Sequence, residues 1–407
     1  MPRILLLIAS KTYRTHDFIE AARRIAVEVV VGSPHRPALA SLMDGRHLRI
    51  DFDEIESSAR RIADLHGRLP LDAVVSLDDS GTLLASVASE RLGFAHNPPA
   101  AVSASRNKAT TREQLRRAGL PTPPFESFPI DADPGTIRTH IPYPCVVKPL
   151  DLSGSQGVIR VDDPARFPEV FARVADIIRS CAQPGSARQV LVEGFIPGRE
   201  VAVEGLLRTG VLEMLALFDK PDPLDGPFFE ETIYVTPSDL PADIQADVVA
   251  STAAAAHALG LREGPVHAEL RINAQGTYVL EVAARSIGGL CSRTLRFGSG
   301  MSLEELILRH AGGLPMPAHQ RERPAAGVMM LPIGSAGRLR EVRGQENARR
   351  VTNVESVVMT IPPGERLVPL PEGDRYLGFI FARAATPASV ERALREAFAC
   401  LEVVTDG

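Results

Sequence analysis

A lysine followed by a run of small residues could bind a polyphosphate. Cys145–Pro149 (CVVKP) is a short apolar run that predicts a buried strand with Lys148 close to its end. Ser153–Gly157 (SGSQG) comes next, where glycines let backbone N–H groups approach a phosphate and serine hydroxyls add donors. The lysine precedes the glycines, so this is not a Walker A loop. The segment predicts a phosphate-binding loop, and an ordinary Gly/Ser turn is the alternative.

Two glutamates on either side of a turn could contact a nucleoside. Glu193 and Glu200 lie seven residues apart in EGFIPGRE and flank Pro197-Gly198. Such carboxylates can accept hydrogen bonds from ribose hydroxyls, while the backbone between them reads a purine edge. A solvated edge turn that binds no ligand is the alternative interpretation of these two glutamates. The alternation in Arg199–Arg208 predicts a strand at a sheet edge.

Two further glutamates could bind a hard cation. His267 and Glu269 lie on one predicted strand, Glu281 lies on the next, and Asn273–Gly276 forms the turn between them. This spacing places both carboxylates on one face of an antiparallel pair, where Mg²⁺ could share them with phosphates. Strand glutamates facing solvent are the alternative, but Glu281 lies in an apolar run where an unpaired carboxylate is costly. No cysteine and no second histidine accompanies them, which disfavours zinc.

Few positions carry a lysine. Lysine and arginine together number 45, of which only Lys11, Lys108, Lys148 and Lys220 are lysine. A lysine kept in so arginine-rich a chain is a candidate for a site that needs a compact point charge. Arg285, which precedes Ser286-Ile287-Gly288-Gly289, could stabilise negative charge on a reacting carboxylate.

The elements that must position these residues fall into three parts. Apolar runs alternate with helical patterns over the first hundred residues, which predicts a parallel α/β domain. The turn at Ser10–Tyr13 holds no glycine, so NAD-dependent oxidoreductase chemistry is disfavoured. A helix is predicted over Ser105–Gly119. The predicted domains are an N-terminal Rossmann-like domain at 1–97, a central domain at 98–315 with a lid subdomain at about 125–195, and a small α+β domain at 316–407.

Charge and cysteine use exclude several classes of function. A net charge of −5 without a run of five like charges disfavours nucleic acids and anionic membranes as partners. The longest apolar runs are too short to span a bilayer, and the N-terminus lacks a signal-peptide cleavage region, so we expect a cytoplasmic protein. The four scattered cysteines predict buried thiols rather than disulfides or a zinc site; they are Cys145, Cys181, Cys291 and Cys400.

The order of these motifs resembles the ATP-grasp superfamily over residues 98 to 315. The resemblance implies an ATP-grasp fold in which Lys108 and Lys148 hold the α- and β-phosphates of ATP. It also implies that the Ser153–Gly157 loop closes over the γ-phosphate and that Glu269 and Glu281 bind Mg²⁺. The nucleotide contacts that it implies beside the phosphates are Lys108, Lys148, Ser153, Gly154, Ser155, Gln156 and Gly157. Those that it implies beside the adenine are Glu193, Gly194, Phe195 and Ile196, and Glu200 would lie beside the ribose. Family members usually carry Asn where this chain has Ala283, so one or two ions, with Mn²⁺ as a possible substitute, are expected.

Within that superfamily the whole chain resembles bacterial L-amino acid ligases and related carboxylate-amine ligases. The segments Phe218–Pro221, Gly226–Thr232 and Pro265–Glu269 have forms common among them. The resemblance implies substrate contacts at Lys220, Glu230, Glu231, His267, Arg285, Gly288 and Gly289. It implies catalytic roles for Arg285, Lys148 and Ser155.

The activity implied by the resemblance is ATP-dependent amide or peptide bond formation through an acyl phosphate, with release of ADP and phosphate. The partners would be a small-molecule carboxylate and an amine, one of them an amino acid, and the enzyme could be a homodimer. A bicarbonate- or formate-activating ligase of the same superfamily is one alternative, although no segment matches the bicarbonate-binding segment of biotin carboxylases. A non-catalytic ATP-binding protein is the other, and Ala283 is its only argument.

Overall fold

The N-terminal part of the chain is a parallel sheet with helices on both faces. A computed structural model describes residues 1–9, 12–35, 46–137, 139–181 and 187–406, so the turn residues Ser10 and Lys11 lie outside it. Leu5 and Leu7 pack toward α2 and α3, whereas Ile4 and Leu6 pack toward α1, which confirms the predicted α/β arrangement. The strand order is β3-β2-β1-β4. The elements are β1 (Arg3–Leu7), α1 (Thr15–Arg24), β2 (Glu28–Ser33), β3 (His47–Arg49), α2 (Ile55–Arg68), β4 (Ala73–Ser76) and α3 (Asp79–Leu92).

The helix predicted over Ser105–Gly119 is confirmed over most of its length, but its predicted start is wrong. The structure has two helices, α4 (Pro99–Arg106) and α5 (Lys108–Arg117), because Asn107 between them is extended. The Asn107 side chain accepts a hydrogen bond from the Thr110 N–H at 3.0 Å, as an N-cap does. This cap makes Lys108 the first residue of α5.

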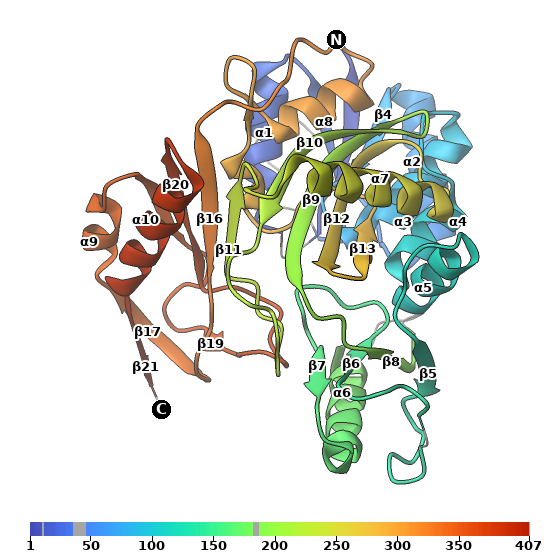
Figure 1. Ribbon diagram of the computed structural model, residues 1–407. Coiled ribbons are helices and arrows are strands. Elements are labelled where there is room, and N and C mark those ends of the chain that lie inside the picture. The colour runs from blue at the N-terminus through green and yellow to red at the C-terminus, as the bar shows by residue number, and fades with distance from the viewer. Residues whose placement is uncertain (10–11, 36–45, 138, 182–186, 407) are drawn as a thin grey trace.

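The predicted lid subdomain forms its own layer. Its antiparallel sheet has the order β5-β8-β6-β7, and α6 packs on it through Phe171 and Val174. Figure 1 shows this lobe below the large sheet. Its elements are β5 (Phe125–Pro129), β6 (Cys145–Pro149), β7 (Ile159–Val161), α6 (Phe167–Cys181) and β8 (Gln189–Gly194).

An eight-stranded antiparallel sheet, in the order β13-β12-β9-β10-β11-β16-β20-β18, forms the centre of the molecule. The prediction that Arg199–Arg208 is an edge strand is wrong, because this strand, β9, pairs with both β10 and β12 and is buried over most of its length. The sheet and the helix against it comprise β9, β10 (Val211–Asp219), β11 (Ile233–Thr236), α7 (Ala242–Leu259), β12 (Gly264–Asn273), β13 (Gly276–Ala283), β16 (Ala325–Leu331), β18 (Val354–Met359) and β20 (Gly378–Ala384).

The C-terminal residues contribute strands to two sheets, the central one and a small one of their own. Their strands β16, β20 and β18 extend the central sheet, so hydrogen bonds run continuously from it into the C-terminal part (Figure 1). A three-stranded sheet, β19-β17-β21, stands beside it. The other elements after residue 290 are β14 (Arg296–Phe297), β15 (Met301–Ser302), α8 (Leu303–Ala311), β17 (Gly337–Arg343), α9 (Gln345–Arg350), β19 (Arg366–Leu367), α10 (Pro387–Ala399) and β21 (Glu402–Asp406).

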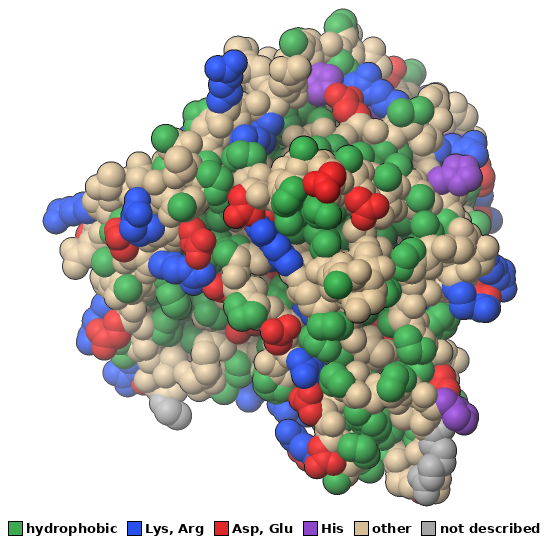
Figure 2. Space-filling model, in the orientation of Figure 1, with side chains coloured by type: hydrophobic (Ala, Val, Ile, Leu, Met, Phe, Trp, Pro, Cys, Tyr) green, Lys and Arg blue, Asp and Glu red, His purple; other side chains and the backbone are tan. Residues whose placement is uncertain are grey.

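The cysteines differ in burial from what we expect. Cys145 and Cys291 are buried, but Cys181 and Cys400 are half-buried; Cys181 is the last residue of α6, and Cys400 follows the last residue of α10. All four are free thiols. In the part of the chain that the structure describes, no helix has the length and apolar character needed to cross a bilayer. Figure 2 shows cationic and anionic side chains interspersed on the face in view, without a continuous basic patch.

The turn at Gly198 provides a test of the fold. Its φ is +126°, and a Cβ there would lie 2.2 Å from the Ile272 carbonyl oxygen, so Gly198→Ala must displace backbone as well as strain it. We expect a loss of about 1–3 kcal/mol, seen as a fall of several degrees in the unfolding midpoint. Gly210→Ala is the matched control, because its φ is +86° and nothing lies within 4 Å. Equal midpoints for the two variants would contradict this account.

Candidate active site

All parts of the molecule contribute to one cavity of about 550 Å³. This volume lies in the range of small-molecule sites. Lys148 comes from the lid, Glu269 and Glu281 from the central sheet, Asp79 from the N-terminal part and Tyr376 from the C-terminal part. Of the predicted site residues, Lys108, Lys148, Ser153, Gly154, Ser155, Glu193, Gly194, Phe195, Ile196, Glu200, Glu231, His267, Glu269, Glu281, Arg285, Gly288 and Gly289 line it. Gln156, Gly157, Lys220 and Glu230 do not.

Lys148 is buried against a carboxylate. Its Nζ donates to Glu193 Oε1 at 2.5 Å, and Arg112 on α5 donates to both oxygens of Glu193, at 2.8 and 3.2 Å. Burial lowers the pKa of Lys148 to about 8 despite the attraction of Glu193. Burial alone would raise the pKa of Glu193, but Arg112 and Lys148 outweigh it and hold that pKa at about 2. The Glu193 carboxylate is therefore engaged by two protein cations.

Lys108 joins three elements at the cavity. Its Nζ donates to the carbonyl oxygen of Leu152 at 2.7 Å and lies 3.8 Å from Glu281 Oε2. Its backbone N–H donates to the carbonyl oxygen of Leu150. The N-terminus of α5, the start of the predicted phosphate loop and β13 therefore meet at this ammonium.

The predicted phosphate loop divides into two halves. Ser153, Gly154 and Ser155 line the cavity, and Gly154 and Ser155 both have φ near +60°, which turns the backbone sharply. Gln156 and Gly157 instead bind the C-terminal segment: Gln156 Nε2 donates to the Glu372 carbonyl oxygen at 2.7 Å, and the Gly157 N–H donates to that of Pro371 at 2.8 Å. Only the first half of the loop is thus available to a phosphate in this conformation.

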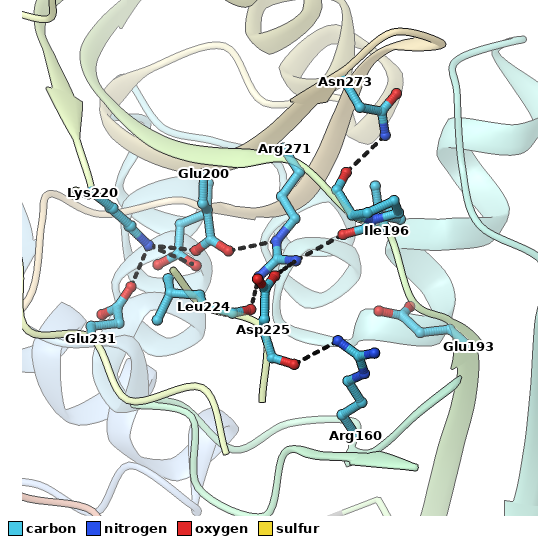
Figure 3. Close-up of polar contacts among 12 residues, drawn as sticks. Arg160, Glu193, Ile196, Glu200, Lys220, Leu224, Asp225, Glu231, Arg271 and Asn273 are labelled. Atoms are coloured by element: carbon cyan, nitrogen blue, oxygen red, sulfur yellow. Dashed lines mark hydrogen bonds and ion pairs between the residues drawn. The ribbon is translucent and has the colours of Figure 1, made fainter. Parts of the chain in front are cut away.

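A buried lysine forms ion pairs with three glutamates (Figure 3). Lys220 Nζ donates to Glu200 Oε1 at 2.8 Å, donates also to Glu231 Oε1, and lies 3.6 Å from Glu269 Oε2. Burial alone would lower the pKa of Lys220, but the three carboxylates raise it. They lie close enough to share a metal ion, and in this structure the ammonium lies within ion-pair distance of all three. Lys220, predicted as a substrate contact, lies behind the cavity wall and orients the groups that line it.

Glu269 and Glu281 retain the arrangement predicted for a metal pair. They are directly opposed in the register of β12 and β13, and both line the cavity. Burial alone would raise the pKa of Glu269, but Lys220 and His267 lower it, which keeps this carboxylate ionised. Two carboxylates beside the predicted phosphate loop offer the oxygen ligands that Mg²⁺ prefers.

Arg271 holds the turn between Glu193 and Glu200. Its Nε donates to Glu200 Oε2 at 2.8 Å and its Nη1 donates to the Ile196 carbonyl oxygen at 2.7 Å (Figure 3). The guanidinium also lies over the Phe195 ring, 5.1 Å from its centroid. Both oxygens of Glu200, predicted to contact a ribose, are thus bonded to protein cations.

The Arg285–Gly289 turn is fixed from two sides. Arg285 Nε donates to Asp79 Oδ2 at 2.8 Å, at the start of α3. The fully buried Glu204 accepts from the Ile287 N–H at 2.9 Å and pairs with His267 Nδ1 at 3.2 Å. Burial alone would lower the pKa of His267, but Glu204 and Glu269 raise it to about 9. The imidazolium therefore links this turn to Glu269.

Sequence reasoning missed Arg112, Arg271, Asp79 and Glu204. Arg112 carried a usable signal, because it lies four residues after Lys108 on the same helix face. Glu204 also stood in an otherwise apolar strand, where a charged residue needs a partner.

Two family models match the chain in order. A model of the ATP-grasp domain matches residues 141–294, and one of the L-amino acid ligase C-terminal domain 2 matches residues 329–406.

Individual relatives extend this similarity. The crystal structure of an L-amino acid ligase from Bacillus licheniformis superposes with a TM-score of 0.83 at 25% identity, covering 100% of this chain and 99% of that one. An uncharacterized protein of Sinorhizobium fredii is 23% identical over 98% of this chain and 82% of its own length. Carnosine synthase 1 of Gallus gallus is 30% identical over 80% of this chain, which spans only 37% of that enzyme. The chain therefore belongs to the ATP-grasp superfamily, among carboxylate-amine ligases similar to L-amino acid ligases.

Proposed function

We propose that this enzyme forms an amide bond between a carboxylate and an amine, one of them an amino acid, and converts ATP to ADP and phosphate. The observation that carries the proposal is that Lys148, Glu281 and Arg285, from separate elements, line one cavity. The names of the similar proteins, an L-amino acid ligase and carnosine synthase, support the substrate class.

The phosphates of ATP would lie between the lid and the central sheet. Lys108 and Lys148 supply positive charge there, and Ser153–Ser155 supply hydroxyl and backbone donors. Glu269 and Glu281 would hold Mg²⁺, which neutralises phosphate charge when bound. As the resemblance implies, we propose one or two ions, with Mn²⁺ as a substitute, and a homodimer.

Arg285 would act where negative charge develops. The substrate carboxylate oxygen attacks the γ-phosphorus, the bond to the β-γ bridging oxygen breaks, and an acyl phosphate and ADP result. The amine then attacks the acyl carbon, loses a proton, and expels phosphate as the amide forms. The guanidinium faces this cavity in a pose fixed by Asp79, so it can stabilise the acyl phosphate and the tetrahedral oxyanion without reorganising.

A screen of acid and amine pairs tests this function. We expect ADP and phosphate release only when ATP, a carboxylate and an amine are all present, with at least one pair that includes an amino acid. Mass spectrometry should find a product equal to the two substrates less one water. Release that requires bicarbonate, or tight ATP binding without release for any pair, would contradict the proposal.

Replacement of Arg285 tests the charge-stabilising role. Arg285→Ala should lower kcat by about 10²-fold or more, because a single such donor typically contributes that much. The Kd for ATP should change little. Arg293→Ala is the matched control, since Arg293 also pairs with a carboxylate of the N-terminal part, Asp17, at 2.8 Å but does not line the cavity. Equal kcat values for the two variants would refute the role.

The pH dependence of ATP binding tests Lys148. With a pKa of about 8 in the free enzyme, Lys148 is cationic at neutral pH and loses its charge as the pH rises through that value. We expect the Kd for ATP to rise above about pH 8, by up to about tenfold per pH unit. Lys148→Met should bind ATP more weakly and lack this dependence. Calorimetry across that range measures both, and a wild-type Kd that stays flat would exclude the role.

A further inference from the structure

The cavity wall beside the Arg285–Gly289 turn is aromatic. Tyr13 and Tyr376 both lie edge-on to Phe379, with ring centroids 5.9 and 6.0 Å from it. Phe379 is fully buried, and a Cβ on Gly289 would lie 3.0 Å from its ring. Both tyrosines line the cavity. The turn that carries Arg285 thus packs on the same ring as two cavity-lining tyrosines from opposite ends of the chain.

Soft apolar groups complete this wall. Met330 lies opposite Phe379 in the register of β16 and β20, and Cys291 follows the glycine turn; both line the cavity. Burial and the charge of Glu231 raise the pKa of Tyr376 well above its ordinary value, so its ring stays neutral. The wall therefore offers aromatic faces, a thioether and a protonated thiol.

The charges of the cavity disfavour an anionic side chain at this wall. Six cationic residues line the cavity in the described part of the chain, and each is already within hydrogen-bond distance of a protein oxygen; they are Arg14, Lys108, Lys148, His267, Arg271 and Arg285. Glu231 and Asp374 are carboxylates that line the cavity together with Tyr376. An acidic side chain here would meet like charges, whereas an apolar one would bury apolar area worth about 25 cal/mol per Å².

We infer that the wall formed by Tyr13 and Tyr376, which the buried Phe379 supports, binds the side chain of an amino acid substrate and selects apolar or aromatic side chains over acidic ones. The inference rests on the proposed function and deepens it by naming the substrate class. Tyr376 is the residue that tests it best, because it lines the cavity and its ring packs against the buried Phe379.

Specificity constants for a panel of amino acids measure this selection. With ATP and a productive co-substrate, wild-type kcat/KM should be at least about tenfold higher for the best of Leu, Met and Phe than for Asp or Glu. Tyr376→Ala should lower kcat/KM for that best substrate by about tenfold or more and for Ala far less, because Ala reaches little of the wall. Tyr376→Phe keeps the ring and should keep the order of preference. The KM for ATP separates a side-chain effect from a loss of the nucleotide site.

Tyr278→Ala is the matched control, because Tyr278 lies on β13 outside the cavity. It should keep the wild-type ranking. A preference for Asp or Glu, or an equal loss for every amino acid in Tyr376→Ala, would overturn the inference. If Tyr376→Ala does not fold, Tyr13→Leu makes the same test from the N-terminal part. Turnover with the wrong ranking contradicts this inference alone, whereas no turnover with any pair contradicts the proposed function and the inference with it.

Discussion

The site depends on the compensation of buried charge. Lys220 has a side chain only 2% exposed, and three carboxylates surround it. Removing one member of such a buried set typically costs about 3–5 kcal/mol, because the charge left behind has no water to solvate it. The lysine therefore fixes where Glu200, Glu231 and Glu269 point, and it keeps Glu269 ionised. A carboxylate in that state can bind a cation without first losing a proton.

The same constraint explains why the cavity requires the whole fold. The partners of its buried cations are remote in sequence: Arg285 and Asp79 are 206 residues apart, and Arg112 and Glu193 are 81 apart. Arginine appears where one cation must bind two oxygens, as Arg112 does with Glu193, because its guanidinium is a planar fork. Lysine appears where a compact charge must fit among several oxygens.

Local patterns predicted what local physics determines. The turn at Asn273–Gly276 joins β12 and β13 as predicted, and the apolar run before Lys148 was indeed a buried strand. The turn register alone would place Leu280 opposite Glu269, and a β-bulge after Glu269 shifts the pairing by one residue so that Glu281 opposes it. The order of strands in the sheet is not a local property, so β9 was mistaken for an edge strand. The partners of Glu193 and Glu200 were missed for the same reason, since nothing near either glutamate in the sequence indicates Arg112 or Arg271. The extended conformation of Asn107 was open to prediction, because asparagine favours N-caps over helix interiors.

Weak contacts join the lid to the C-terminal segment, which suits an enzyme proposed to exchange nucleotide. Two hydrogen bonds join Gln156 and Gly157 to the C-terminal segment, and each is worth about 1 kcal/mol net. The ion pair between Arg173 and Glu372 has both side chains 44% exposed, where such pairs contribute about 1 kcal/mol at most. Contacts of this size break readily, unlike the buried pairs around Lys220. The buried ion pairs therefore lie around the cavity, and the weak contacts lie where, under the proposed function, the chain would open for nucleotide to enter and ADP to leave.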